Sequence, residues 1–282
     1  MVISRRAVLA GLAASVALPH QARAARGLPF GIQLYTVGGA LRKDFTGTLT
    51  QLAAMGYTDV ELADTLDKSA TDLRAGFAAA GLMCRSMHVG VDQLESALSR
   101  TVDFAKTLGV TYVVCPFPRL ANLKAPTRDE WLWHADFFNR TAAVLKNAGL
   151  QFGYHNHNIE FTRYGNRSAF DELIARTDPA LVKFQLDCGW AAAAGLDPAI
   201  VLARYPGRIR LLHVKDVKSD LVPNTALEIE TTAIGAGFLD WANIFDAAQE
   251  AGVVGYYVEL EPPSTPDPMI AAKKSREFLA RL

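Results

Sequence analysis

The sequence predicts a single-domain (β/α)8 barrel, also called a TIM barrel. Eight strand-like segments alternate with helix-like segments from residue 25 to the end of the 282-residue chain. Several helix-like segments end in glycine directly before the next strand. No linker or low-complexity segment divides the chain, and α/β barrels of this length commonly form one domain.

The eight predicted strands are short, rich in β-branched and aromatic residues, and bounded by Gly, Pro or Asp. They cover residues 31–37, 59–63, 83–89, 112–117, 151–157, 182–187, 209–215 and 256–261. A doubly wound sheet also alternates strands with helices, but it rarely needs eight such units. The number of strands therefore favours the barrel.

Between the strands, apolar residues recur at the i, i+3, i+4 spacing of an amphipathic helix. Residues 48–55 show this spacing, and so do Leu94, Ala97, Leu98 and Val102. A left-handed glycine commonly ends a helix and turns the chain back toward the sheet. We expect that role for Gly56, Gly81, Gly109, Gly149 and Gly252.

The first 24 residues have the pattern of a twin-arginine export signal. Arg5 and Arg6 precede the apolar run 7–18, Pro19 ends it, and residues 22–24 read Ala-Arg-Ala, as at a signal-peptidase site. An ordinary helix or a membrane anchor is the alternative, but the run is short and rich in alanine for an anchor. We therefore predict a signal peptide at 1–24, a barrel at 25–282 and a periplasmic location.

Composition argues against two classes of partner. Three basic residues and no acidic residue lie in 1–24, which leaves 26 basic against 29 acidic residues and a net charge of −3. We expect no nucleic-acid partner without a basic excess, and no membrane partner after signal removal. The separated Cys84, Cys115 and Cys188 predict buried thiols rather than disulfides. The composition leaves both a monomer and a homo-oligomer open.

The carboxyl-terminal strand ends, where such barrels carry their active sites, offer metal ligands. Side chains two residues apart share one face of a strand, so one inward-facing residue from each of the last four strands can converge. The predicted ligands are His155, Asp187, His213 and Glu259. A mixed His, Asp and Glu set suits one divalent Mn, Fe, Co or Zn ion better than Ca²⁺.

Alternatives stay open at each of these positions. His157 shares the parity of His155 and is the alternative ligand from the fifth strand. A single histidine near a strand end is often an ordinary core residue, and an aspartate after a strand often caps a helix. Four strand ends with a ligand type at the same level together favour the metal site.

Several motifs resemble the xylose isomerase-like barrels, specifically the exported sugar phosphate isomerase/epimerase-like proteins. The resemblance covers nearly the whole chain after residue 24. It rests on residues 154–161 (YHNHNIEF), 178–187 (DPALVKFQLD), 205–209 (YPGRI), 212–216 (LHVKD) and 235–241 (GAGFLDW).

This resemblance implies a metal-dependent sugar isomerase or epimerase, with two departures. The better-known epimerases carry a glutamate at the fifth-strand metal position, where this chain has His155. The family often has a glutamate between the two glycines where this chain has Ala236. The familiar mechanism with two opposed glutamates therefore cannot be transferred intact.

We expect proton abstraction beside a metal-polarised carbonyl group. Glu259 is the predicted base. Lys215, two residues after His213, is a candidate acid/base or hydroxyl-binding group, or it pairs with Asp216 or Glu261. His88, at the end of the third strand, is the candidate proton-transfer group on the opposite side.

Further residues are candidates for substrate binding. Glu61 and Glu160 have carboxylates that can accept hydrogen bonds from sugar hydroxyls, although each alone can equally be a surface ion-pair partner. Trp190 can stack on a sugar, with His157 nearby. Tyr35 and Gln33 are candidates for the floor of the site, although aromatic residues at a barrel mouth are equally ordinary core.

The predicted function is a metal-dependent isomerase or epimerase of a small sugar or keto-sugar. Elimination begins with the same proton abstraction, so a lyase or hydratase of 3-keto-glycosides is an alternative, which the absent fifth-strand glutamate favours. A non-catalytic periplasmic sugar-binding barrel is a further alternative. The predicted export and the lack of a glycine-rich phosphate loop argue against a phosphorylated substrate.

Overall fold

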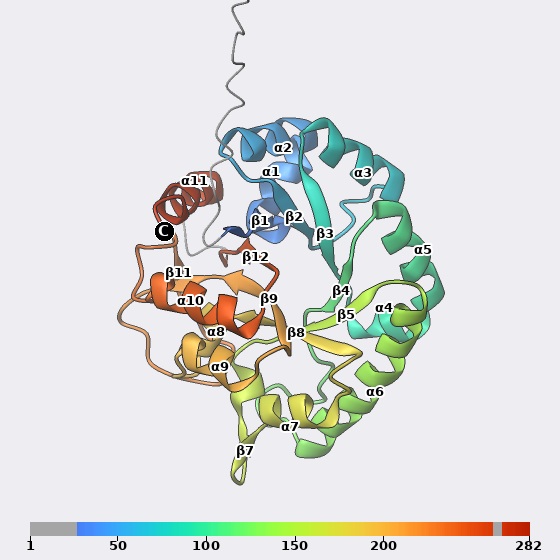
Figure 1. The fold of residues 1–282 in the computed structure, drawn as a ribbon, viewed down its shortest axis with the longest axis vertical. Helices are drawn as coiled ribbons and strands as arrows, with labels where there is room; N and C mark the ends of the chain where they lie inside the picture. The colour runs from blue at the N-terminus through green and yellow to red at the C-terminus, as the bar shows by residue number, and fades with distance from the viewer. Residues whose placement is uncertain (1–26, 262–266) are drawn as a thin grey trace, which may run out of the picture.

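A computed structural model describes residues 27–261 and 267–282, which form a closed barrel of eight parallel strands ringed by helices (Figure 1). Around the barrel the strand order is β1-β12-β9-β8-β5-β4-β3-β2. The predicted single-domain (β/α)8 barrel is confirmed. The predicted signal at 1–24 and the Pro-rich segment 262–266 lie outside the described residues.

Each of the eight barrel strands overlaps one of the predicted segments. Their bounds are β1 (Phe30–Gln33), β2 (Asp59–Leu62), β3 (Met83–His88), β4 (Tyr112–Cys115), β5 (Gln151–His155), β8 (Val182–Asp187), β9 (Ile209–Val214) and β12 (Gly255–Val258). Two short hairpins lie outside the barrel, β6 (Arg163–Tyr164) with β7 (Arg167–Ser168) and β10 (Asp216–Val217) with β11 (Thr231–Thr232).

The prediction was wrong where it extended strands past the rim of the barrel. The segment Leu34–Val37 is a 3-10 turn (η2) instead of strand, and the side chain of Gln33 accepts a hydrogen bond from the backbone of Tyr35 (3.2 Å) to begin it. β5 ends at His155, so His157 already belongs to the following loop. No neighbouring strand pairs with these residues, so the extended conformation is not maintained.

In the described ranges, seven helical connections and the final helix α11 surround the barrel, and three of the connections contain two α-helices. The helices are α1 (Gly38–Lys43), α2 (Phe45–Ala54), α3 (Ala70–Ala79), α4 (Val91–Ser96), α5 (Leu98–Leu108), α6 (Arg128–Asn147), α7 (Ala169–Arg176), α8 (Cys188–Ala193), α9 (Pro198–Arg204), α10 (Trp241–Ala251) and α11 (Pro268–Leu279); η3 (Ile159–Phe161) is a 3-10 turn. The predicted continuous helix through Ala97 breaks there, because Ala97 leaves the helical region (φ −141°).

The five predicted glycine helix ends are confirmed, because all five glycines have φ values between 73° and 94°. Glycine also permits close packing inside the barrel. A side chain at Gly31 would overlap the backbone oxygen of Tyr256 and the ring of Tyr257. The strands therefore approach closely, and Val114, Leu211 and Tyr257 fill part of the interior.

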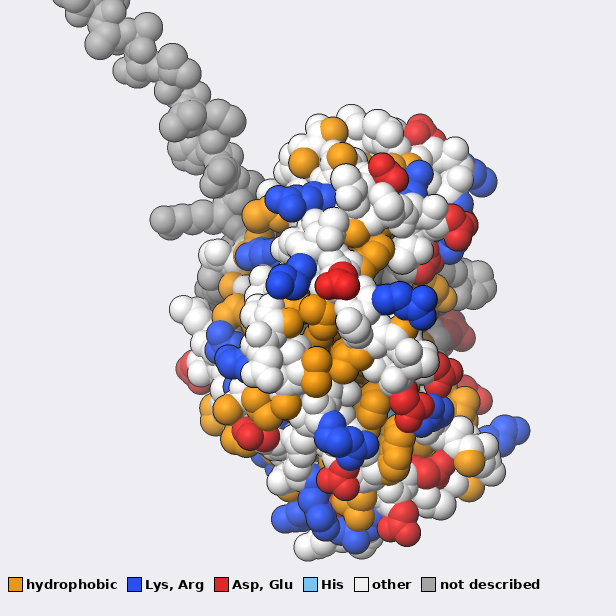
Figure 2. Space-filling model, turned by 90° about the vertical axis from the view of Figure 1, so that its right-hand side faces the viewer, with side chains coloured by type: hydrophobic (Ala, Val, Ile, Leu, Met, Phe, Trp, Pro, Cys, Tyr) orange, Lys and Arg blue, Asp and Glu red, His pale blue; other side chains and the backbone are white. Residues whose placement is uncertain are grey.

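Leu211 precedes His213 by two residues, so the apolar interior leads directly to a polar layer nearer the carboxyl ends of the strands. The three cysteines form no disulfide, in agreement with the prediction; Cys115 and Cys188 are buried and Cys84 is partly buried. No helix of the described ranges is long and apolar enough to cross a membrane. On the face shown in Figure 2, basic and acidic side chains are interspersed.

Candidate metal centre

The structure brings the four predicted metal ligands together. His155, Asp187, His213 and Glu259 each present one ligand atom, and these atoms all lie within 4.8 Å of one another. Asp187 and His213 are direct register partners on β8 and β9. Glu259 follows β12, whose Tyr257 pairs with His213. Strand parity and register therefore place the four side chains at one level inside the barrel mouth.

The quartet of His155, Asp187, His213 and Glu259 fits a divalent cation. His155 Nδ1 is buried and has no hydrogen-bond partner among the described residues. A buried nitrogen without a partner is costly unless a ligand satisfies it. Two carboxylates and two imidazoles form a donor set of the borderline type that binds Zn²⁺, Fe²⁺, Co²⁺ or Mn²⁺.

His157 lies beside the quartet but outside it. Its ring contacts the rings of Phe117 (5.0 Å between centroids), His155 (5.0 Å) and Trp190 (5.1 Å). Burial and the nearby Lys215 ammonium lower the pKa of His157 to about 3, so its imidazole is neutral. The geometry therefore groups His155, rather than His157, with the other three candidates.

Lys215 holds the acidic side of the site together. Its Nζ lies 3.0 Å from Asp187 Oδ2, 2.9 Å from Glu259 Oε2 and 2.7 Å from Glu261 Oε1. Burial lowers the pKa of Lys215, but the three carboxylates outweigh this effect and raise it well above its usual value. Burial raises the pKa of Glu259, but Lys215 and His213 bring it well below its usual range. Lys215 is therefore a cation and Glu259 an anion.

Two glutamates hold the ring of His213. Its Nδ1 lies 2.8 Å from Glu259 Oε2, and its Nε2 lies 2.5 Å from Glu61 Oε2. Burial lowers the pKa of His213, but Glu259 and Glu61 raise it to about 10. Without a cation, the ring is an imidazolium that donates to both carboxylates.

Glu61 is not at the mouth, where a sugar hydroxyl could reach it. It has 0% of its surface exposed. Its carboxylate accepts hydrogen bonds from Gln33 (2.9 Å), Ser86 (2.5 Å), Gln185 (2.8 Å) and His213. The predicted role in substrate binding is corrected, because these donors occupy both oxygens.

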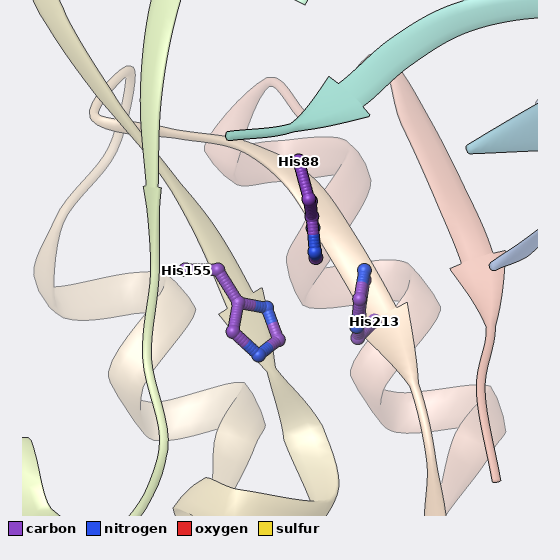
Figure 3. Close-up of side chains that lie close together, drawn as sticks. All are labelled: His88, His155 and His213. Carbon is purple, nitrogen blue, oxygen red and sulfur yellow. The ribbon is translucent and has the colours of Figure 1, made fainter. Parts of the chain in front are cut away.

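His88 also faces inward. Its ring is stacked on that of His213, with centroids 5.3 Å apart and 13° between the planes (Figure 3). His88 Nε2 lies 3.0 Å from Gln185 Oε1, and its Nδ1 lies 3.5 Å from Gln33 Nε2. Both nitrogens thus have partners within the barrel, which does not fit the predicted proton transfer to a substrate. His88, His155 and His213 also form a second cluster of potential ligands, which shares two members with the quartet.

Comparison with known proteins agrees with this fold. The model of the xylose isomerase-like TIM barrel family matches residues 49–282. The chain belongs to this family. An inosose dehydratase of Geobacillus kaustophilus (strain HTA426) is 30% identical over 266 residues, which cover 83% of this chain and 86% of that protein.

Two solved structures extend the comparison. A sugar phosphate isomerase/epimerase from Parabacteroides distasonis ATCC 8503 is 28% identical, with a TM-score of 0.75 over 90% of this chain and 94% of that one. A xylose isomerase-like TIM barrel protein from Mycobacterium smegmatis, solved in complex with magnesium, is 17% identical, with a TM-score of 0.67 over 92% of this chain and 97% of that one. At that identity, the second match supports the fold alone.

In this xylose isomerase-like barrel, Glu160 lies beneath the loop that follows β5. It is fully buried, accepts a hydrogen bond from Tyr154 Oη (2.5 Å), and accepts another from the backbone N–H of His157 (2.8 Å). Burial raises the pKa of Glu160 to about 7. The predicted contact with sugar hydroxyls is therefore corrected, because both oxygens bind the chain itself.

Trp190 and Tyr35 are better placed for a substrate. Trp190 lies against His157, and its Nε1 is buried without a hydrogen-bond partner among the described residues. The Lys215 ammonium lies 5.2 Å from the centre of its ring. Tyr35 is 49% exposed, close enough to Glu261 and Glu259 for both to raise the pKa of its hydroxyl in addition to the larger effect of burial. Gln33 instead points inward to Glu61.

The Gly235-x-Gly237 motif organises a loop of this family member. The carboxylate of Asp216 accepts hydrogen bonds from the backbone N–H groups of Gly235 (2.8 Å) and Gly237 (3.2 Å) and from Trp241 Nε1 (3.0 Å). A Cβ atom at Gly237 would overlap Asp216. The loop amides thus bind an internal carboxylate instead of a phosphate. Gly237 is required by the close approach of Asp216, and Gly235 by its φ of 84°.

Sequence reasoning missed Ser86 and Gln185, which bind Glu61, and Asn158. The Asn158 side chain donates to Asn224 Oδ1 (2.8 Å) and accepts from the backbone of Leu227 (3.0 Å), so it ties the loop after β5 to residues 224–227. Parity could have found Gln185, which is two residues before Asp187. No local pattern marks the other contacts, because their partners are distant in the chain.

Proposed function

We propose that this chain is a metal-dependent lyase that eliminates a substituent β to the carbonyl group of a keto-sugar or a related polyhydroxy ketone. The observation that carries this proposal is the buried contact between Lys215 Nζ and Glu259 Oε2 (2.9 Å). It places a proton donor and a proton acceptor on one side of the quartet. The relative named inosose dehydratase, which carries out an elimination, supports the same reaction class.

His155, Asp187, His213 and Glu259 are the residues that would hold the cation. The metal we propose is Mn, Fe, Co or Zn, since the donors are mixed nitrogen and oxygen. When bound, such a cation supplies Lewis-acid polarisation of the substrate carbonyl and makes the adjacent C–H group more acidic.

Glu259 takes the proton from the carbon next to the carbonyl group. It is anionic because Lys215 and His213 hold its pKa well below the usual range against the opposing effect of burial. Lys215 donates a proton to the leaving oxygen as the carbon–oxygen bond breaks, so a hydroxyl substituent leaves as water. The proton on Glu259 then returns to Lys215 across their contact. The net reaction is loss of H and OH, and both residues regain their starting states.

On the β5 side, the quartet carries His155, where the resemblance to the better-known epimerases implies a glutamate. Burial, together with His213, lowers the pKa of His155 well below its usual value. A neutral imidazole in that position suits a ligand better than a general acid. Epimerisation by two opposed acid/base groups is therefore less well supported than elimination from one side.

A second candidate function is the isomerase or epimerase reaction, which the Parabacteroides distasonis match supports at 28% identity. In that case the proton on Glu259 would return to carbon instead of accompanying loss of a substituent. In both reactions, Trp190 and Tyr35 are the proposed substrate-binding residues at the mouth.

The test is to follow keto-sugars and inososes by NMR in D₂O with metal-loaded protein. The expected result is formation of an unsaturated ketone or its diketone tautomer, in wild type but not in Glu259→Gln. Deuterium incorporation without loss of the substituent would indicate the second candidate. Saturable binding without either change would indicate a non-catalytic sugar-binding barrel.

We also propose that the protein is exported to the periplasm, which rests on the pattern of residues 1–24. An unphosphorylated substrate fits that location. Arg5→Lys with Arg6→Lys should keep the protein in the cytoplasm if the twin-arginine route is used. Unchanged export of this double variant would contradict that route.

A further inference from the structure

The buried carboxylate Glu61 takes no part in the proposed proton transfers, yet it lies in direct contact with the candidate metal ligand His213. It comes from β2, on the other side of the barrel interior from the quartet strands. A buried carboxylate is costly unless hydrogen bonds compensate for its lost hydration. Its surroundings explain how this cost is met and what the residue does.

Three neutral donors bind Glu61 in a defined orientation. Gln33 Oε1 accepts from the Tyr35 backbone, which turns its Nε2 toward Glu61 Oε2 (2.9 Å). Gln185 Oε1 faces His88 Nε2 (3.0 Å), which turns its own Nε2 toward Glu61 Oε1 (2.8 Å). The hydroxyl of Ser86 donates to the same Oε1. The carboxylate is thus held from β1, β3 and β8.

Two histidines also face Glu61 Oε2: His88 Nε2 lies 3.1 Å away, and His213 Nε2 lies closer, at 2.5 Å. The other ring nitrogen, Nδ1, faces the quartet, 2.8 Å from Glu259 Oε2 and 3.7 Å from Asp187 Oδ2. A histidine that donates from one nitrogen to a fixed acceptor keeps the lone pair of the other nitrogen for a cation.

We infer that Glu61 is a positioning residue, which holds the ring of His213 with Nε2–H on the carboxylate and Nδ1 directed at the metal position. This inference rests on the proposed metal-dependent function. Glu61 itself does not belong to either cluster of candidate ligands. It acts through His213, and Gln33, Ser86 and Gln185 act by orienting Glu61.

Metal affinity tests this inference without an activity assay. Zn²⁺ and Co²⁺ dissociation constants are measured by competition with a chromophoric chelator for wild type, Glu61→Ala, Glu61→Gln, Ser86→Ala and one control. Ser86→Ala removes one of the donors that orient Glu61, so it should weaken metal binding less than Glu61→Ala does. The control, Glu172→Gln, alters another buried glutamate, which lies on the outer helix α7, is 3% exposed and pairs with Arg128 at 2.8 Å.

We expect Glu61→Ala to weaken the binding of both metals about 10- to 100-fold. Glu61→Gln should lose less metal affinity, since its amide oxygen can still accept a hydrogen bond from His213, at the expense of the Gln185 contact. The Co²⁺ absorption spectrum should change in Glu61→Ala, because His213 is then free to turn, and remain as wild type in Glu172→Gln. Thermal unfolding of the metal-free proteins identifies any variant that does not fold.

Wild-type affinity and an unchanged Co²⁺ spectrum in folded Glu61→Ala would overturn the inference. An equal loss of affinity in Glu172→Gln would also overturn it, because the effect would then be general to buried carboxylates. If Glu61→Ala does not fold, Glu61→Gln decides: a smaller loss of affinity supports the inference, and wild-type affinity overturns it. Absence of stoichiometric metal in wild type would instead contradict the proposed metal-dependent function.

Discussion

Lys215 Nζ and Glu259 Oε2 form an ion pair of 2.9 Å inside the barrel mouth, and Lys215 has 0% of its surface exposed. The same ammonium reaches Asp187 (3.0 Å). One cation therefore balances two of the candidate metal ligands. Its loss should affect both chemistry and the stability of the metal-free protein, and these two effects can be measured separately.

Lys215→Met should lower kcat of the elimination about 10²- to 10⁴-fold, the usual contribution of a general acid. It should also destabilise the metal-free protein by about 3–5 kcal/mol, because two buried carboxylates lose their partner. Steady-state kinetics and urea unfolding measure the two effects. Lys183→Met is the matched control, since Lys183 Nζ donates only to the backbone oxygens of Pro179 and Gly207. Wild-type kcat in Lys215→Met would contradict the proposed role.

Metal should stabilise the folded protein, and His155→Ala should remove most of this effect. A cation at about 100 times its Kd adds about 2.7 kcal/mol to the unfolding free energy. His157→Ala should keep the gain in Tm, because His157 is outside the quartet. Differential scanning calorimetry with and without Zn²⁺ measures both. If only His157→Ala abolished the gain, the fifth-strand ligand would be His157.

The unfolding free energy should depend on pH through the titration of Asp59. Burial raises the pKa of Asp59 to about 6, above its ordinary value of 3.8, against the lowering effect of Arg85, whose Nε lies 2.8 Å away. The folded state holds this proton more tightly than the unfolded state. The resulting stability is therefore present below about pH 4 and is lost as pH rises toward 6.

Asp59→Asn cannot titrate, so it should lose less stability than wild type between pH 4 and pH 7.5. The difference in unfolding free energy between the two proteins should shift by roughly 2–3 kcal/mol in favour of the variant as pH rises. Urea unfolding at both pH values measures this double difference. A constant difference would show that Asp59 has no raised pKa in the folded protein.

Gly237→Ala should destabilise the protein by about 1–3 kcal/mol, because the added methyl group overlaps Asp216 in a buried loop. Asp216→Asn should cost a similar amount, since it weakens the hydrogen bonds to Gly235, Gly237 and Trp241. Gly39→Ala is the control, because no atom lies within 4 Å of its added Cβ. Chemical unfolding at pH 7.5 compares the three variants, and equal stability of Gly237→Ala and Gly39→Ala would contradict the proposed contact.

The quartet could be predicted because it depends on properties that are local in sequence. Strand side chains alternate with a period of two, and parallel barrel strands end at one rim. His155, Asp187 and His213 each occupy such a position. The ends of the strands could not be predicted as well, since a strand stops where its neighbour stops. His157 therefore lies in a loop.

The sequence did not predict that Glu61, Glu160 and His88 bind partners inside the protein. Each was expected to face the substrate, and each binds groups inside the protein instead. Glu61 and Ser86 are 25 residues apart in the chain, and Glu61 and Gln185 are 124 apart. No spacing rule connects residues at such separations.

The alternation of strands and helices, the glycine helix ends and the inward ligand positions were determined by the sequence itself, because short-range periodicity and backbone preference control them. Closure of the barrel decided the rest. It set β2 across the interior from β8 and β9, and so placed Glu61 on His213. It also enclosed Lys215 between Asp187 and Glu259, where the low exposure strengthens the ion pairs. Those contacts depend on the distance between strands, which only the folded barrel defines.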